Sequence, residues 1–169
     1  LRGTFHGMDR ILSLPRAYYP ARDGAVYFPI ADNVHDIYRR GIDATDGTPV
    51  VNYGNYGILY QIRLPMAGRG RMNCFLSPLG GVYAGAVSAM SGGGRRLVET
   101  PAARAFFGDQ TQPESPQAAQ ARAEGLCRLT PYTELADLGT YGADAPVTFL
   151  YSPPGASNLP VNIILMPEK

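Results

Sequence analysis

The chain of 169 residues contains no Trp, two Cys, two His and a single Lys, Lys169. No CxxC, HxH or HxxxH spacing occurs, so no zinc site is expected. A net charge of +1, with 17% charged residues, provides no field for binding a polyanion, and we expect no nucleic-acid partner. No apolar run approaches the roughly 20 residues that a membrane-spanning helix needs. We therefore expect no membrane span and no cofactor.

Glycine and proline are abundant, with 20 Gly and 15 Pro, and 11 Tyr outnumber 6 Phe. The Gly and Pro residues mostly separate short apolar runs, which is typical of turns in an all-β protein. The chain starts at Leu1 rather than Met, which predicts a processed or excised fragment.

Alternating side chains predict the strands. Ile58, Tyr60, Ile62 and Leu64 alternate with Leu59, Gln61 and Arg63, the period of two expected when one strand face meets a core. Similar runs occur within 3–14 and at 26–30, 50–52, 71–76, 82–90, 95–100, 133–138, 147–151 and 161–165.

This spacing predicts a single all-β domain over 1–169: a β-sandwich or jelly roll of about eight to ten short, mostly antiparallel strands. The polar stretch near 103–123 is expected to be a long loop or short helical insertion. The segment Asp32–Arg40 fits either a helical turn or a strand.

The sequence allows two interpretations of the two cysteines, a disulfide or two free thiols. Cys74 alternates in phase with Met72 and Leu76, which indicates that it faces the core. A Cys74–Cys127 disulfide would close a long loop and stabilise the fold by about 4 kcal/mol. Two buried free thiols are the alternative.

Acid–base and metal chemistry have few candidates. His6 and His35 each lie near a carboxylate in sequence, Asp9 and Asp36 respectively. A histidine with a carboxylate suits a hydrolase or a metal site. A metal usually requires three or four ligands, so these side chains favour structural or surface roles, and we assign no catalytic or metal-binding residue.

Tyrosine is the better candidate for binding. Tyr53, Tyr56, Tyr60 and Tyr83 lie in a ring-rich part of the chain. Exposed on a sandwich face, such rings would stack on sugars or form a protein interface, and packing against neighbouring strands is the alternative.

Several stretches resemble an uncharacterised family of exported bacterial proteins found in cyanobacteria and Gram-positive bacteria. They are Asn52–Pro65 (NYGNYGILYQIRLP), Leu76–Ala86 (LSPLGGVYAGA), Pro153–Pro167 (PPGASNLPVNIILMP) and Leu1–Phe5 (LRGTF). In Gram-positive members the region often follows a stalk domain of the copper-amine-oxidase N-terminal type. The resemblance implies a β-rich fold and an extracellular or cell-envelope location, and it supplies no catalytic motif.

Three functional hypotheses follow. The first is a non-catalytic extracellular or cell-envelope binding or structural module that self-associates through strand edges, with other copies of itself as partners. The second is a carbohydrate-binding module that presents a tyrosine platform to cell-surface glycan. The third is a hydrolase or metal-dependent enzyme that uses His6, Asp9, His35 and Asp36.

Overall fold

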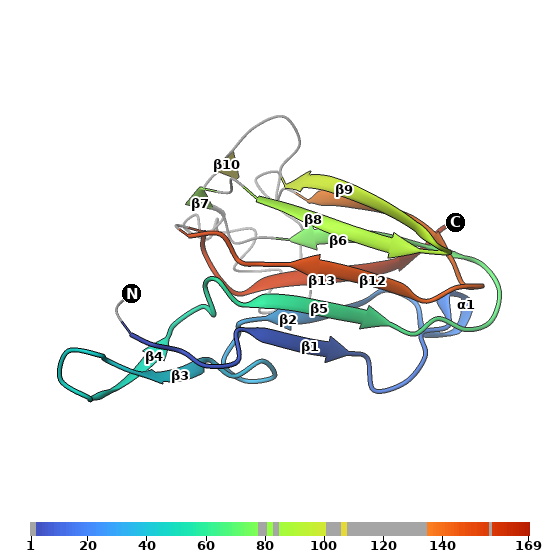
Figure 1. Cartoon of the computed structure of the whole chain (residues 1–169). Coiled ribbons are helices and arrows are strands. Elements are labelled where there is room, and N and C mark those ends of the chain that lie inside the picture. Colours follow the sequence, from blue (N-terminus) through green and yellow to red (C-terminus); the bar gives the residue numbers. More distant parts are fainter. Residues whose placement is uncertain (1–2, 78–80, 83–84, 101–105, 108–134, 156) are drawn as a thin grey trace, which may run out of the picture.

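The computed structural model describes residues 3–77, 81–82, 85–100, 106–107, 135–155 and 157–169, which are almost entirely β (Figure 1). Two large sheets form the fold. The first has the strand order β1-β5-β12-β8-β9 and consists of β1 (Asp9–Ser13), β5 (Leu59–Leu64), β12 (Val147–Tyr151), β8 (Gly85–Ser91) and β9 (Gly94–Thr100). The second has the order β11-β6-β13-β2 and consists of β11 (Ala136–Gly142), β6 (Arg71–Ser77), β13 (Val161–Pro167) and β2 (Val26–Ile30).

Two small ribbons accompany these sheets. One pairs β3 (Arg39–Ile42) with β4 (Pro49–Asn52), and the other pairs β7 (Gly81–Val82) with β10 (Phe106–Phe107). Only the β1–β5 pairing is parallel among the named strands of the described residues. The predicted all-β, sandwich-like and mostly antiparallel fold is confirmed.

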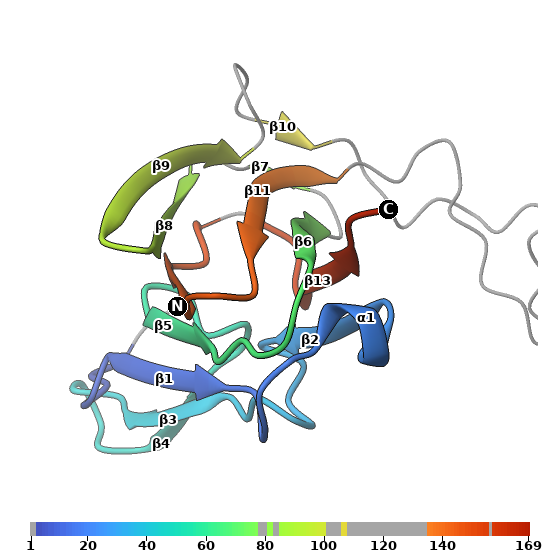
Figure 2. The same ribbon diagram turned by 90° about the vertical axis from the view of Figure 1, so that its right-hand side faces the viewer.

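The two sheets pack face to face as separate layers (Figure 2). Alternate residues of β5, β12, β6 and β13 point between the layers and are buried in one apolar core: Tyr60, Ile62, Leu64, Val147, Phe149, Tyr151, Met72, Cys74, Leu76, Val161, Ile163 and Leu165. The predicted inward orientation of Cys74 is confirmed, and Cys74 is a buried free cysteine. Its proposed partner, Cys127, lies outside the described residues.

The segment Asp32–Arg40 is neither the helical turn nor the single strand that its sequence allows. Residues 31–38 form an irregular loop with positive φ at Ala31 and Asn33 (both 58°), and Arg39 and Arg40 begin β3. A left-handed residue at two positions interrupts both kinds of regular structure.

Two further differences concern short segments. A one-turn helix, α1 (Pro20–Asp23), lies between the runs predicted within 3–14 and at 26–30, and the Asp23 carboxylate accepts the N–H of Tyr19 (2.9 Å). Within the predicted 103–123 insertion, Phe106–Phe107 forms β10 and the rest lies outside the described residues. No helix in the described part of the chain is long and apolar enough to cross a membrane.

Candidate functional site

A groove of about 330 Å³ opens where the edge strands of the two sheets, β1 and β2, border one side of the sandwich. Its wall is mainly apolar, and the loop 31–38 closes it with two polar residues. It is lined by Leu12, Ser13, Leu14, Pro15, Tyr27, Phe28, Pro29, His35, Asp36 and Ile62. Because Ile62 is fully buried, the groove reaches the core from the rim, and its apolar walls suit an apolar side chain.

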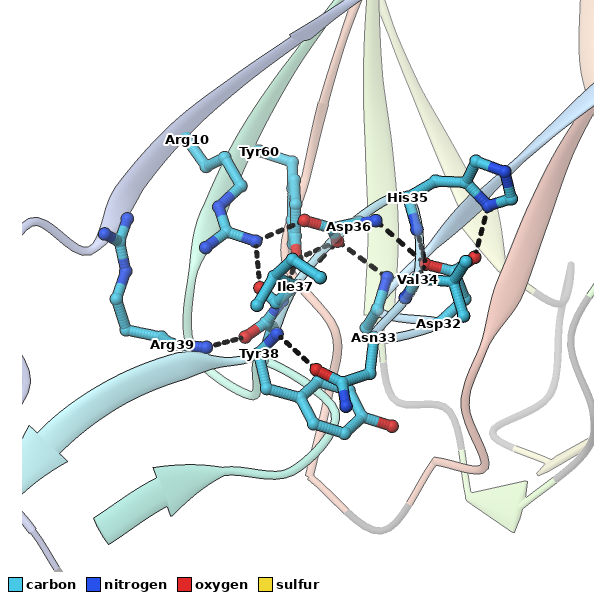
Figure 3. A network of polar contacts seen from close by, with 12 residues as sticks. Arg10, Asp32, Asn33, Val34, His35, Asp36, Ile37, Tyr38, Arg39 and Tyr60 are labelled. Atoms are coloured by element: carbon cyan, nitrogen blue, oxygen red, sulfur yellow. Dashed lines mark hydrogen bonds and ion pairs between the residues drawn. The ribbon is translucent and has the colours of Figure 1, made fainter. Parts of the chain in front are cut away.

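A buried carboxylate, Asp36, lines this groove and lies within a network of polar contacts (Figure 3). Its Oδ1 accepts a hydrogen bond from Arg10 Nη1 of β1 and forms an ion pair with it. Its Oδ2 accepts the N–H of Ala31 (2.6 Å) and the hydroxyl of Tyr60 in β5 (2.6 Å). Both oxygens are thus occupied, which stabilises a charge that burial alone would penalise.

Tyr60 and Asn55 extend this polar cluster into the interior. Asn55 Nδ2 donates to the Tyr60 hydroxyl (2.8 Å), and Asn55 Oδ1 accepts the N–H of Arg39 (2.7 Å). Burial, together with the adjacent Asp36 carboxylate, raises the pKa of Tyr60 far above its ordinary value. The hydroxyl therefore remains a protonated donor, fixed between two partners.

The loop itself is organised by Asp32. Asp32 Oδ1 accepts the N–H groups of Val34, His35 and Asp36 at 3.1, 2.9 and 2.8 Å. Partial burial raises the pKa of Asp32, but these donors and the His35 ring outweigh it and lower the pKa to about 2. This is the side-chain-to-backbone bonding by which Asp stabilises turns instead of helices.

The predicted acid–base set is not assembled as a catalytic group. His35 Nδ1 lies 2.7 Å from Asp32 Oδ2 with an exposed ring, and Asp36 binds Arg10 and Tyr60. His6 and Asp9 are exposed. Within the described residues, no three His, Cys, Asp or Glu side chains gather closely enough to hold a metal ion.

The four tyrosines do not share one surface. Tyr60 is fully buried, so its proposed place on a platform is wrong: the same alternation that marks Ile58 and Ile62 as core residues also turns Tyr60 inward. Tyr56 is half-buried, and its hydroxyl donates to the Ser157 carbonyl (2.6 Å). Tyr53 is 69% exposed and meets Tyr38 edge to face, with ring centroids 5.7 Å apart. Tyr83 lies outside the described residues.

Sequence reasoning missed two residues. Arg10 binds Asp36, and Asn55 contacts Asp36 and accepts the N–H of Arg39 at the start of β3. Their partners lie 26 and 16 to 19 positions away, and no local spacing marks such contacts. A weak signal was present in Arg10 itself, a charged residue in phase with the inward-facing Leu12.

The side of the sandwich that β1 and β2 border has a second feature, the outer edge of β1, which is the edge that does not pair with β5. Leu59 N–H donates to the Met8 carbonyl (2.8 Å), and Asp9 is aligned with Leu59. In a parallel ladder with this register, the backbone groups of Asp9, Ile11 and Ser13 point away from β5. Within the described residues, the backbone N–H and C=O groups of Ile11 and Ser13 have no hydrogen-bond partner. In that part of the chain, the Asp9 carbonyl has only a long contact with Arg39 Nη2 (3.5 Å).

No family model, curated protein or solved structure matches the chain.

Proposed function

We propose that this protein is a non-catalytic binding or structural module of the extracellular space or cell envelope that self-associates through a strand edge. One observation carries the proposal: the edge of β1 presents unbonded backbone groups beside an apolar groove. Such an edge is a template for another strand, and an adjacent groove accepts the side chains of that strand.

The polar residues near the groove support a non-catalytic role. Asp36 is bound by Arg10, Tyr60 and the Ala31 N–H, and Asp32 is bound by three backbone N–H groups. A general base must reach a substrate proton, and these carboxylates are already hydrogen-bonded within the protein. The cluster therefore serves to fix the loop at the end of the groove.

The proposed location rests on the resemblance of Asn52–Pro65 and Pro153–Pro167 to exported bacterial proteins. The same 52–65 stretch contains Asn55 and Tyr60, so part of the resemblance falls on residues that organise the β1 side of the sandwich.

Sedimentation velocity tests self-association directly. We expect the weight-average sedimentation coefficient of the intact chain to rise between about 1 µM and 1 mM. A coefficient that stays at the monomer value over this range would contradict the proposal.

Glycan binding is a second candidate, favoured by the exposed Tyr53 ring that is supported by Tyr38. An aromatic ring held in this way suits stacking on a sugar. A glycan array tests it: we expect Tyr53→Ala to abolish a signal that Tyr27→Ala preserves, since Tyr27 is equally exposed (70%) but lies on β2. An array without any signal would remove this candidate.

A further inference from the structure

We infer that the partner of β1 is β1 of a second copy, paired antiparallel about a two-fold axis through Ile11, so that the two five-stranded sheets join into one. This inference rests on the proposed function and names the edge and the register that it uses.

The four edges of the two sheets differ in how they are protected. The edge strand β9 carries Arg95, Arg96 and Glu99, and charged side chains discourage strand addition. On β2, Pro29 provides no N–H, and on β11 a register shift between Asp137 and Gly139 interrupts the ladder. On β1 the first two residues, Asp9 and Arg10, are charged, and the remaining three, Ile11–Ser13, have no charge, proline or bulge.

The backbone of β1 is complementary to itself. In an antiparallel pair centred on Ile11, each Ile11 exchanges N–H and C=O with its copy, and Asp9 lies opposite Ser13 of the partner copy. All three residues are those whose backbone groups face away from β5, and at Asp9 the pairing replaces the long contact of its carbonyl with Arg39 Nη2 (3.5 Å). A two-fold axis makes such an interface isologous, as most homodimer interfaces are.

Side chains on the outer face also agree with this register. Ile11 is 56% exposed, and pairing brings the two copies of it into contact at the centre. Arg63 is aligned with Ser13 on the neighbouring strand, so it flanks the Ser13 that faces Asp9 of the other copy. The small Ser13 side chain lets each Arg63 reach across towards that Asp9 carboxylate, which gives two intermolecular ion pairs.

The groove is covered by the same arrangement. Arg10 Nη1 donates to the Ile37 carbonyl (2.7 Å), so Ile37, 54% exposed, lies beside the first half of β1. Pairing about Ile11 sets Arg10 opposite Leu12 of the partner copy, and Leu12 borders the groove. Ile37 of each copy therefore lies at the mouth of the other copy's groove, and pairing buries its apolar side chain there.

Cysteine cross-linking tests this register. Asp9→Cys and Ser13→Cys are each introduced into a Cys127→Ser background, with one variant tagged to differ in mass. Burial raises the pKa of Cys74 to about 12, so this remaining thiol stays inert at pH 8. Opposed residues have Cα atoms about 5.5 Å apart, within disulfide range, whereas the two copies of residue 9 are about 14 Å apart.

We expect mild oxidation of the mixture to give at least tenfold more heterodimer than either homodimer. Ile11→Cys alone is expected to form a homodimer, and Leu97→Cys, on the opposite edge and 69% exposed, is the matched control that does not. Equal yields of homodimer and heterodimer, or cross-linking of Leu97→Cys as rapid as that of Ile11→Cys, would overturn the β1 pairing. Concentration-dependent sedimentation together with either result would leave the proposed self-association intact and assign it to another edge.

Discussion

Single side chains decide how the loop at the end of the groove folds, and Tyr60 is the clearest case. Its hydroxyl is buried, donates to Asp36 and accepts from Asn55. Tyr60→Phe leaves the Asp36 Oδ2 with one close donor and one long contact, and the unsatisfied buried groups cost about 1 to 3 kcal/mol. We expect Tyr60→Phe to lower the free energy of unfolding, measured by urea denaturation, by this amount.

The matched control for that change is Tyr53→Phe. Tyr53 is 69% exposed, so loss of its hydroxyl is expected to change the free energy of unfolding by less than about 0.5 kcal/mol. Equal effects of the two substitutions would show that the buried hydroxyl does not stabilise the fold.

Asp32 gives the loop a dependence on pH. Its pKa is about 2 in the folded protein, against 3.8 as the ordinary value. A carboxylate whose pKa falls on folding stabilises the native state above the unfolded pKa, and that stability is lost as the pH falls through the folded pKa.

We therefore expect Asp32→Asn to lower the free energy of unfolding by about 1 to 2 kcal/mol above pH 5. This difference from the wild type should shrink as the pH falls from about 4 to about 2, since Asp32 is protonated first in the unfolded state and then, near pH 2, in the folded state. Urea denaturation of both proteins across this range is the measurement. A difference that stays constant down to pH 2 would contradict the role of the charge.

At the scale of elements, the tight connection between β4 and β5 holds the polar cluster in place. Asn52 bonds both the N–H and the carbonyl of Tyr56, and Asn55 adopts a positive φ of 52°. Gly54 has a φ of 93°, and a Cβ there would lie 2.7 Å from Leu159 Cδ1. Both its backbone conformation and its surroundings require glycine.

Gly54→Ala is accordingly expected to destabilise the fold by about 2 kcal/mol or more, through left-handed strain and the clash with Leu159. Gly155→Ala is the matched control, because no atom lies within 4 Å of a Cβ at that glycine. Thermal unfolding of both variants checks the difference. A Gly54→Ala protein as stable as Gly155→Ala would contradict this account of the connection.

The strands were predictable from sequence where one face of a strand meets the core. The patterns at 58–64, 71–76 and 147–151 correspond closely to β5, β6 and β12, because burial of every second side chain imposes a period of two. The loop 31–38 was not predictable in full: the local bonds of Asp32 are of a kind that a sequence can suggest, but the place of the loop against the sheet depends on bonds from Asp36 to Arg10 and Tyr60, 26 and 24 positions away. Partners that distant leave no local pattern.

The candidate site was harder to predict than the fold. Asp36 and His35 were singled out as chemical groups, and both line the groove. Their bonds, however, fix the loop. The parallel pairing of β1 with β5 leaves the other edge of β1 unpaired among the described residues. This pairing depends on chain topology and cannot be predicted from the residues of β1 alone.

For the whole molecule, the central feature is the side where β1 and β2 border the sandwich. The core lies between two layers whose other edges carry charge, a proline or a bulge, while β1 has none of these over Ile11–Ser13. The Asp36 cluster holds the 31–38 loop beside this edge, so the stability of the loop and the proposed association are connected through Arg10, which lies in β1 and binds that loop.

Hydrogen–deuterium exchange at increasing protein concentration tests this central claim most directly. The amide groups of Ile11 and Ser13 point away from β5 and should exchange rapidly in the monomer. We predict that a peptide covering Asp9–Ser13 becomes protected as the concentration rises through the association range, whereas a peptide covering β9 does not change. Association accompanied by unchanged exchange in β1, or by new protection confined to β9, would contradict the account.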